Sequence, residues 1–330
     1  MTHYYNQRDQ HANGRRILAI SAAGGHFKQL VRLVPRIPGV GSVTWLTYDS
    51  GLSTDLLRAA GYGDDRLVYA PYAAPRDLPN LARNAAVAQG LLSEEPYDLA
   101  VSTGAGIAVA TLPLARVRGV HACYIESAAR TLGPSLSGRI LRRTPGIDLV
   151  TQNKGYPRGW RYVGSVHDEF ERGPDRQVYQ KVRKVVVTLG TSEAYGFLRL
   201  IKRLIEFLPP TVKVLWQTGM TDAEGLGIDA RARIPGPELE TAIQEADAVI
   251  AHAGVGSALT AFELGVFPIL VPRRHAFGEN IDDHQEVTAS DLATRGLALS
   301  IEADELSMGH LETVAQRSIV QRAAPPLLDI

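Results

Sequence analysis

The chain has one cysteine, Cys123, among its 330 residues. A single thiol cannot close an intramolecular disulfide, which excludes a disulfide-stapled scaffold and favours a reducing compartment. Cys123 lies in the apolar run 121–125, so we expect a buried thiol rather than a nucleophile. The sequence also has no Asp-x-Asp pair and no histidines at metal-ligand spacing, so we expect neither a metal site nor a cofactor.

Long apolar runs are absent as well. Residues 1–16 are polar, without the apolar core of a signal peptide, and no segment reaches the roughly 18 apolar residues of a spanning helix. We therefore expect a cytoplasmic protein, and peripheral attachment at the inner face of the plasma membrane stays open. No G-x-G-x-x-G follows the first strand-like run and no P-loop occurs, which argues against a dinucleotide enzyme and a P-loop NTPase.

The net charge is zero, but the charges are unevenly distributed. Residues 1–165 contain 19 Lys and Arg against 11 Asp and Glu, whereas residues 166–330 contain 16 against 24. A basic first half suits an anionic partner such as a phospholipid surface or a pyrophosphate, while mutual attraction of the halves explains the asymmetry equally well. We expect no nucleic-acid partner.

Strand-like apolar runs alternate with helix-length stretches, which predicts α/β architecture with parallel sheets buried on both faces. The strand-like runs are 17–21, 43–48, 67–70, 99–102, 122–126, 149–152, 161–163, 184–189, 213–217, 248–251 and 268–271. The helices expected between such runs include 77–92, 106–117 and 257–264. We expect a flexible N-terminus (1–16), a first doubly wound domain (17–165), a linker (166–182) and a second such domain (183–330). The C-terminal tail is a candidate to pack back on the first domain.

Ligands of open α/β sheets bind beyond the carboxyl ends of the strands, so the strand-to-helix turns are the places to search. In the first half, Gly24 and Gly25 permit close backbone approach, and His26 would project toward a ligand; a tight turn with a capping histidine is the alternative. A second such turn holds Thr103 and Gly104. Glu126 ends a strand as an acid, a base or an acceptor, or as the partner of Arg130.

In the second half, two turns predict a phosphate-binding site, because small residues leave N–H groups free at the start of a helix. The candidate ligand-binding residues in this half are Gly190, Thr191, Ser192, His252, Gly254, Val255, Gly256, Ser257, Glu263, His284 and Gln285. Glu263 could accept both hydroxyls of a ribose, and the polar cluster that ends at Gln285 could contact sugar hydroxyls.

These motifs resemble a known enzyme group. V-T-L-G-T-S (187–192), A-H-A-G-V-G-S (251–257), A-F-E-L-G (261–265), P-I-L-V-P (268–272) and D-H-Q (283–285) are similar to the donor domain of MurG-related and Alg13-type glycosyltransferases of family 28. S-A-A-G-G-H (21–26), V-S-T-G-A-G (101–106), Y-I-E-S-A-A-R (124–130) and P-S-L-S-G-R (134–139) resemble the Alg14 subunit and its bacterial exopolysaccharide counterparts. The order indicates one chain that fuses two subunits.

The resemblance implies a GT-B fold of two facing Rossmann-like domains, a UDP-sugar donor, inversion without an essential metal, and a polyprenyl-pyrophosphate-linked saccharide as acceptor. It makes the candidates of the second half donor-binding residues, with Gly254 to Ser257 and Thr191 at the diphosphate, Glu263 at the ribose, and His284 with Gln285 at the donor sugar. It places His26 near the acceptor, and the expected acceptor-binding residues are Gly24, Gly25, Thr103, Gly104 and Arg130. His26 is our first choice for the general base, because a neutral imidazole accepts protons near neutral pH, and Glu126 is the second.

Two departures from the family matter. The N-terminal membrane helix of Alg14 is missing, so anchoring would be peripheral, with Leu136–Arg143 either a membrane-binding surface or an ordinary amphipathic helix. Arg273 and Arg274 would suit a glucuronate donor, whereas N-acetylglucosamine needs no such charge. The alternative functions are a UDP-sugar 2-epimerase, a natural-product glycosyltransferase with a soluble acceptor, and a non-catalytic partner subunit.

Overall fold

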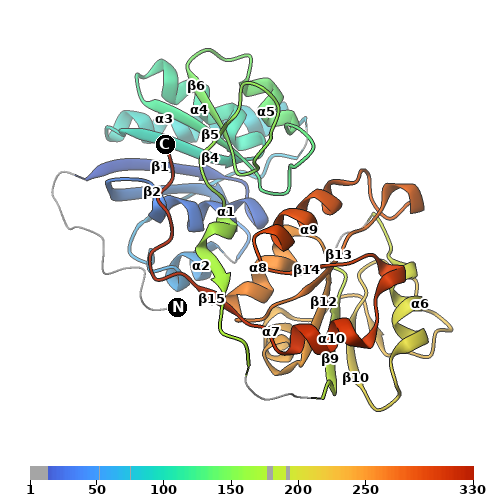
Figure 1. The fold of residues 1–330 in the computed structure, drawn as a ribbon. Helices are drawn as coiled ribbons and strands as arrows, with labels where there is room; N and C mark the ends of the chain where they lie inside the picture. Colours follow the sequence, from blue (N-terminus) through green and yellow to red (C-terminus); the bar gives the residue numbers. More distant parts are fainter. Residues whose placement is uncertain (1–13, 52, 75, 177–180, 191–193) are drawn as a thin grey trace. The chain divides into compact units, whose positions relative to one another are not determined.

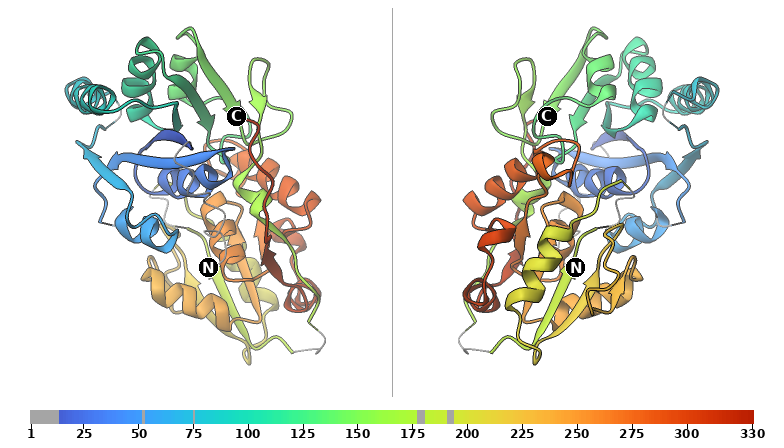
Figure 2. Two further views of the ribbon diagram at one scale, coloured as in Figure 1. Left: turned by 90° about the vertical axis from the view of Figure 1, so that its left-hand side faces the viewer. Right: turned by 90° about the vertical axis from the view of Figure 1, so that its right-hand side faces the viewer.

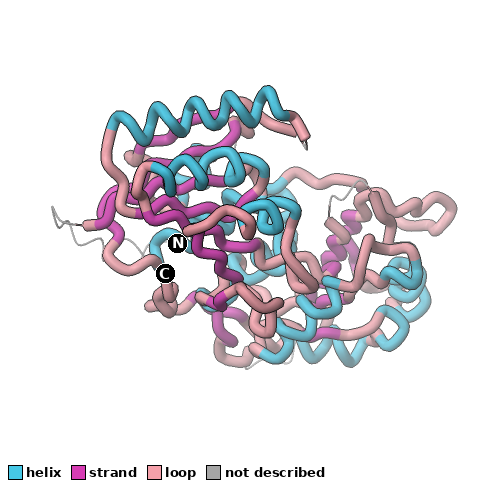
Figure 3. The backbone as a smooth tube through the Cα atoms, turned by 90° about the horizontal axis from the view of Figure 1, so that it is seen from above, coloured by secondary structure: helices cyan, strands magenta, loops and turns pink. Residues whose placement is uncertain are grey.

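The structure is a computed structural model that describes residues 14–51, 53–74, 76–176, 181–190 and 194–330 (Figure 1). The chain divides into two compact units. Unit 1 comprises Met1–Asp168 together with Ala323–Ile330, and unit 2 comprises Glu169–Arg322. Each unit is an α/β body in which helices alternate with parallel strands (Figure 3).

Unit 1 is built on a parallel sheet in the order β3-β2-β1-β4-β5-β6-β7. Its strands are β1 (Arg15–Ser21), β2 (Val40–Tyr48), β3 (Arg66–Ala70), β4 (Leu99–Gly104), β5 (His121–Glu126), β6 (Ile147–Thr151) and β7 (Arg161–Tyr162). The central strand β1 is fully buried over Ile17–Ile20, as expected for apolar runs covered on both faces. The strand order reverses direction between β1 and β4, so the carboxyl ends of these two strands mark the switch point where such folds bind ligands.

The helices of unit 1 cover both faces of this sheet. They are α1 (Gly25–Leu33), η2 (Val34–Arg36), α2 (Ser53–Ala59), α3 (Leu78–Glu94), α4 (Gly106–Val117) and α5 (Leu136–Leu141). In Figure 1, α3, α4 and α5 lie on one face, and α1 and α2 lie on the other. Asp77 caps α3 by accepting from the Asn80 N–H at 3.1 Å, which explains why this helix begins where its sequence pattern begins.

Unit 2 is built on a second parallel sheet in the order β11-β10-β9-β12-β13-β14. Its strands are β9 (Lys184–Thr188), β10 (Lys213–Gln217), β11 (Ala230–Arg231), β12 (Ala248–His252), β13 (Ile269–Val271) and β14 (Leu299–Ser300). Its helices are α6 (Leu198–Phe207), α7 (Gly236–Glu245), α8 (Val255–Glu263), η4 (His275–Phe277), α9 (His284–Thr294), η5 (Ala303–Glu305) and α10 (Met308–Ala315). The switch point here lies between β9 and β12.

The segment expected to be a linker, 166–182, is partly regular structure. It contains η3 (Val166–Glu169) and β8 (Phe170–Arg172), and β8 pairs antiparallel with β15 (Ile319–Gln321). Phe170 also packs on Phe262, with ring centroids 5.4 Å apart. The prediction of an irregular linker is therefore wrong for 166–172, because the partner strand lies far away in the sequence and leaves no local signal. Residues 177–180 are outside the described part.

The prediction of a flexible N-terminus over residues 1–16 is wrong for its last two residues. Arg15 and Arg16 belong to β1 rather than to the expected flexible segment 1–16, and residues 1–13 lie outside the described chain. The Arg15 N–H donates to the Gly39 carbonyl at 2.7 Å, and the Arg16 N–H donates to Asp98 at 2.7 Å. These two bonds hold Arg15 and Arg16 in place, so β1 begins two residues before the apolar run.

The C-terminal tail packs within unit 1. The Leu328 side chain is buried and its N–H donates to the Arg36 carbonyl at 2.7 Å. Arg36, itself buried, donates from Nε to the Pro326 carbonyl at 2.8 Å. In Figure 2 the tail, in dark red, runs beside the green segment that includes β7, and the Asp329 N–H donates to the Val163 carbonyl at 3.3 Å.

Candidate functional site

The first candidate turn follows β1 in unit 1. Gly24 has φ +78°, a left-handed conformation that favours glycine, and it precedes the first residue of α1. The Ala22 N–H donates to the Gly104 carbonyl at 2.7 Å, which ties this turn to the turn that follows β4. The structure therefore brings together four of the expected acceptor-side residues: Gly24, Gly25, Thr103 and Gly104.

His26 and Thr103 hold each other through two hydrogen bonds. The Thr103 hydroxyl donates to the His26 carbonyl at 2.8 Å, and Nδ1 of His26 lies 2.7 Å from the Thr103 carbonyl oxygen. A carbonyl oxygen can only accept, so Nδ1 carries the proton of the ring. The lone pair of the neutral imidazole is then on Nε2, which is the atom that can accept a proton from a substrate.

The surroundings of His26 keep its ring neutral. Burial lowers the pKa of His26, the hydrogen bond to Thr103 opposes this effect, and the positive charge of Arg130 lowers the pKa further. A Cβ on Gly104, where φ is +107°, would lie only 3.3 Å from the ring, so the imidazole packs directly against this glycine. A neutral imidazole with a fixed tautomer fits the role of a general base at neutral pH.

Glu126 has a different role from the one expected as second choice for the base. Its side chain is completely buried, and Oε2 accepts from the Ser135 N–H at 2.9 Å and the Ser135 hydroxyl at 3.1 Å. Oε1 faces the Tyr124 hydroxyl and the Ser127 N–H, both at 3.3 Å. Burial raises the pKa of Glu126, and these hydrogen bonds oppose the rise. Glu126 thus fixes the start of α5, which Ser135 caps, and both of its oxygens are engaged by groups of unit 1.

Two buried glutamines complete this region and were missed from the sequence. Gln29 accepts at Oε1 from the Ala128 N–H at 3.0 Å and from Gln152 at 2.9 Å, and it donates to the Ser127 hydroxyl at 3.0 Å. Gln152 also donates to the Glu126 carbonyl at 3.1 Å. The available signal was positional: Gln152 directly follows a buried strand, and Gln29 lies one helical turn after His26.

Arg130 is exposed on the loop that these glutamines support. Asn153 donates from its side-chain amide to the Ala128 carbonyl at 3.2 Å and to the Arg130 carbonyl at 3.1 Å, which fixes the backbone of the loop. The guanidinium is close enough for its charge to lower the pKa of both His26 and Glu126. Arg130 therefore presents a positive charge near the ring of His26.

In unit 2, His252 lies at the carboxyl end of β12 and is enclosed by two glycines. A Cβ on Gly190 would lie 2.6 Å from the ring, and a Cβ on Gly254 would overlap with Nε2. Burial lowers the pKa of His252 to about 4, and the nearby charge of Arg273 acts in the same direction. His252 is therefore a neutral spacer between the turns after β9 and β12. Thr191 and Ser192 lie outside the described residues.

Helix α8 offers an open N-terminus at this point. It begins at Val255, two residues before the expected start, and its N-cap Gly254 provides no side-chain hydrogen bond. The N–H groups of Val255, Gly256 and Ser257 are the first-turn donors that have no partner within an α-helix. These donors and the helix dipole suit an anion. The expected residues Gly254, Val255, Gly256 and Ser257 form the N-cap and the first three positions of the helix.

Glu263 is the last residue of α8. At 1.5 Å per residue it lies roughly 10 Å further along the helix than Gly256, on the same face. Thr260 lies between them on that face, about one turn from Gly256, and its hydroxyl donates to the Gly256 carbonyl at 3.1 Å. Thr260 is therefore a second candidate for the ribose contact predicted for Glu263, because it is nearer to the helix N-terminus.

The arginine pair does not form the carboxylate-binding site that the sequence suggested. Arg274 pairs with Glu286 and with Glu302, whose Oε1 lies 2.6 Å from NH2. Arg273 is buried and donates to the carbonyls of Leu189 and Tyr195. Both guanidinium groups already have partners within the protein, so the argument for a glucuronate donor no longer holds.

His284 and Gln285 begin α9. The side-chain oxygen of Gln285 accepts from the Arg273 N–H at 3.1 Å, and Nδ1 of His284 contacts Asp282. The Gln285 side chain is buried and His284 is partly exposed. Of the two expected sugar contacts, His284 is thus the more accessible one.

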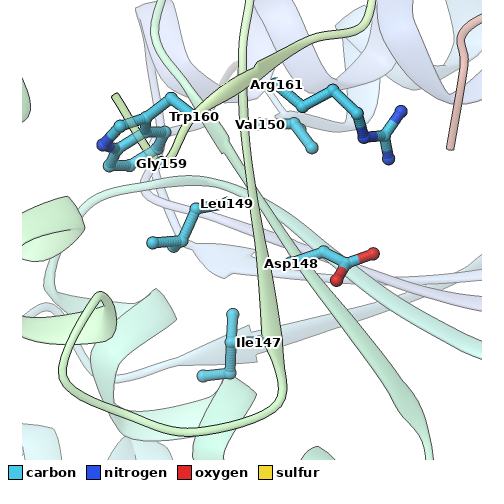
Figure 4. Close-up of a pocket in the computed structure, with 7 residues that line it drawn as sticks. All are labelled: Ile147, Asp148, Leu149, Val150, Gly159, Trp160 and Arg161. Carbon is cyan, nitrogen blue, oxygen red and sulfur yellow. The ribbon is translucent and has the colours of Figure 1, made fainter. Parts of the chain in front are cut away.

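The described residues also form a surface hollow away from these turns. A surface hollow of about 410 Å³ lies where β7 diverges from β6, and it is lined by Leu149, Trp160 and Arg161 among others (Figure 4). It lies along β6 and before β7, away from the turns after β1 and β4. No helix in the described chain is long and apolar enough to cross a membrane, and no three His, Cys, Asp or Glu side chains there form a metal-binding group.

Two Rossmann-like units with glycine turns at their switch points are typical of the GT-B fold. The glycosyltransferase family 28 C-terminal domain matches residues 184–324. The chain is a glycosyltransferase, and its second unit contains this family 28 domain.

Relatives extend over both units. The UDP-N-acetylglucosamine–N-acetylmuramyl-(pentapeptide) pyrophosphoryl-undecaprenol N-acetylglucosamine transferase of Parasynechococcus marenigrum (strain WH8102) is 26% identical over 347 aligned residues, which cover 96% of this chain and 90% of that protein. The crystal structure of Acinetobacter baumannii MurG has a TM-score of 0.55 at 18% identity and covers 91% and 89% of the two chains. A UDP-N-acetylglucosamine 2-epimerase structure has a TM-score of 0.56 at 11% identity and covers 92% and 86%, so the fold alone does not separate the two activities.

Proposed function

We propose that this protein transfers a sugar of the N-acetylglucosamine type from a UDP-sugar to a saccharide carried on a polyprenyl diphosphate, in the synthesis of a cell-surface polysaccharide or glycoconjugate. The activity for which the Parasynechococcus relative is named supports both substrate classes, since the alignment covers 96% of this chain. The observation that carries the proposal is the neutral, tautomer-fixed His26 in a glycine turn of an MurG-related transferase.

In the proposed donor site, the free N–H groups at the start of α8 bind the diphosphate. Glu263, or Thr260 one turn before it, accepts the ribose hydroxyls, and His284 with Gln285 contacts the sugar. The internal pairing of Arg274 with Glu302 supports a neutral sugar over an acidic one. The developing charge of the leaving UDP is then met by the helix dipole, and the proposed reaction uses no cofactor.

In the proposed reaction, Nε2 of His26 removes the proton of the acceptor hydroxyl. That oxygen forms a bond to the anomeric carbon while the bond between this carbon and the UDP oxygen breaks, so the configuration inverts. Thr103 holds the His26 ring through Nδ1, which leaves Nε2 in position to accept. Arg130 supplies a positive charge near this base for the anionic acceptor.

The surface of α5 supports peripheral binding to an anionic membrane at the inner face of the plasma membrane. Leu136 and Ile140 expose 57% and 41% of their surface, whereas an ordinary amphipathic helix would bury such residues. Arg139, Arg142 and Arg143 are exposed around them. Apolar side chains surrounded by arginines are suited to insert beside acidic headgroups.

Transfer from labelled UDP-N-acetylglucosamine to polyprenyl-diphosphate-linked saccharides tests the proposal. We expect label in the lipid fraction only when enzyme, donor and acceptor are all present, and less label with UDP-glucuronate. An enzyme that epimerises the donor alone, or that labels only soluble acceptors, would contradict it. Flotation with phosphatidylglycerol vesicles tests the membrane part: Leu136→Ser with Ile140→Ser should abolish binding, and Leu78→Ser, which changes an exposed leucine of α3, should not.

A further inference from the structure

Resting on the proposed UDP donor, we infer that Arg273 is a positioning residue of the diphosphate site, which ties together the two flanks of the turn after β9 and places a buried positive charge beside it. Arg273 follows β13 and Pro272, in a part of the chain that is distant in sequence from the turn it supports. Its role is separate from the sugar recognition that its sequence suggested.

The geometry of the guanidinium shows which backbone it holds. NH2 donates to the Leu189 carbonyl at 2.8 Å, and NH1 donates to the Tyr195 carbonyl at 2.7 Å. Leu189 precedes Gly190, and Tyr195 comes five residues after Gly190, so the two bonds link described residues on both sides of 191–193. The planar fork of arginine can make both bonds at once.

The neighbours of Arg273 make it rigid. The plane of Phe197 lies beneath the guanidinium, with its centroid 5.5 Å from Cζ. The Arg273 N–H donates to the Gln285 side chain at 3.1 Å, which connects this residue to the start of α9. The Arg273 side chain is only 3% exposed, so it cannot move to solvent without opening the structure.

The charge of Arg273 is the second observation. Within the described chain, Arg273 forms no ion pair and its Nε has no hydrogen-bond partner. The neighbouring arginines differ: Arg274 pairs with Glu302, and Arg199 takes both oxygens of Glu279. A buried cation without a carboxylate partner is costly, and an anionic ligand nearby offsets that cost.

Of His252 and Arg273, only Arg273 carries a positive charge at neutral pH. The pKa of His252 is lowered to about 4, in part by the charge of Arg273, so this imidazole is neutral at pH 7 and adds no charge. Burial lowers the pKa of Arg273 and Glu279 opposes this, but a guanidinium remains protonated in proteins. His252 packs against Gly254, the N-cap of α8, and the charge of Arg273 acts on this ring, so the cation is near the helix start that the donor-site proposal assigns to the diphosphate.

Calorimetric titration with uridine, UMP and UDP tests the inference. The phosphate contribution is the ratio of UDP affinity to uridine affinity, and we expect Arg273→Gln to reduce this ratio by roughly ten-fold or more, since the charge acts in a poorly screened site. Arg273→Lys keeps the charge and should stay within about three-fold of the wild-type ratio. The matched control is Arg274→Gln, whose arginine pairs with carboxylates, and it should leave the ratio unchanged.

The outcomes separate three readings. If uridine and UDP weaken equally in Arg273→Gln, or if its ratio stays at the wild-type value, Arg273 is only a structural support and the inference is wrong. Should Arg273→Gln fail to fold, a lost ratio in folded Arg273→Lys overturns the inference and a kept ratio supports it. A wild-type protein that binds UDP no better than uridine contradicts the proposed donor instead.

Discussion

Each unit has a histidine near the carboxyl end of a central strand, but the two histidines have different roles. In unit 1, His26 follows a glycine turn after β1, and its Nδ1 bonds to the Thr103 carbonyl, so Nε2 keeps its lone pair. In unit 2, His252 ends β12, and its ring fills the space between Gly190 and Gly254. Burial lowers the pKa of both rings, so neutrality alone does not identify a base. The partners of each nitrogen decide the role.

Removing the first histidine should have the largest effect. We expect His26→Ala to lower turnover by roughly 10²–10⁴-fold, because the proposed base is lost. UDP affinity should stay unchanged, since His26 lies in unit 1, outside the proposed donor site. Steady-state kinetics with calorimetry measure both. The control is His121→Ala, which removes an exposed histidine paired with Asp148. Near-normal turnover of His26→Ala would place the base elsewhere.

The second histidine can be tested through its glycine. Gly254→Ala should destabilise the protein by about 1–3 kcal/mol, because the new methyl group overlaps with the His252 ring. Adding His252→Ala should recover part of this loss, since the colliding ring is gone. Urea unfolding of both single variants and the double variant gives the coupling. Strict additivity would contradict the spacer role of His252.

The ribose contact can be assigned by comparing two positions on α8. We expect Glu263→Ala to weaken UDP binding by about ten-fold, in the range of lost hydrogen bonds to a charged group. Thr260→Val is the alternative, because Thr260 lies nearer to the helix N-terminus. Calorimetry with UDP measures both variants. If Glu263→Ala binds UDP normally and Thr260→Val does not, the ribose assignment moves to Thr260.

The smallest expected effect concerns pH. Only neutral His26 can act as the base, and burial followed by the charge of Arg130 lowers its pKa below the ordinary 6.5. We therefore expect kcat/KM to stay constant as the pH falls to 6.5 and to decrease only below that value. Arg130→Gln removes a positive neighbour and should move this decrease to higher pH. A profile that already falls between pH 8 and 7, or one unchanged in Arg130→Gln, would argue against His26 as the base.

The strand and helix pattern could be predicted because it depends on local periodicity. The helix expected at 106–117 is α4 with the same bounds, since its apolar residues repeat at helical spacing between two glycine-containing turns. The pairing of β8 with β15 could not be predicted, because its two short strands come from distant parts of the chain.

The strand-to-helix turns of the candidate site could be predicted from the sequence, but the partners of their side chains could not. The turns that bear His26 and Gly254 follow from the rule that ligands bind at carboxyl ends of strands. Arg273 and Glu126 were misassigned, because a sequence does not show whether a charged group faces a ligand or its own backbone. Arg273 bonds to two carbonyls and Glu126 to Ser135, and only the fold brings these partners together.

The buried position of Leu328 has a practical consequence for dissecting the molecule. A polypeptide cut after residue 168 would lack the tail that donates to the Arg36 carbonyl and accepts from Arg36 at Pro326. The buried Arg36 would then lose one of its carbonyl acceptors, and an apolar surface of unit 1 would be open to water. Anyone who wishes to produce unit 1 alone should therefore graft residues 323–330 back onto it, and affinity tags belong at the other terminus.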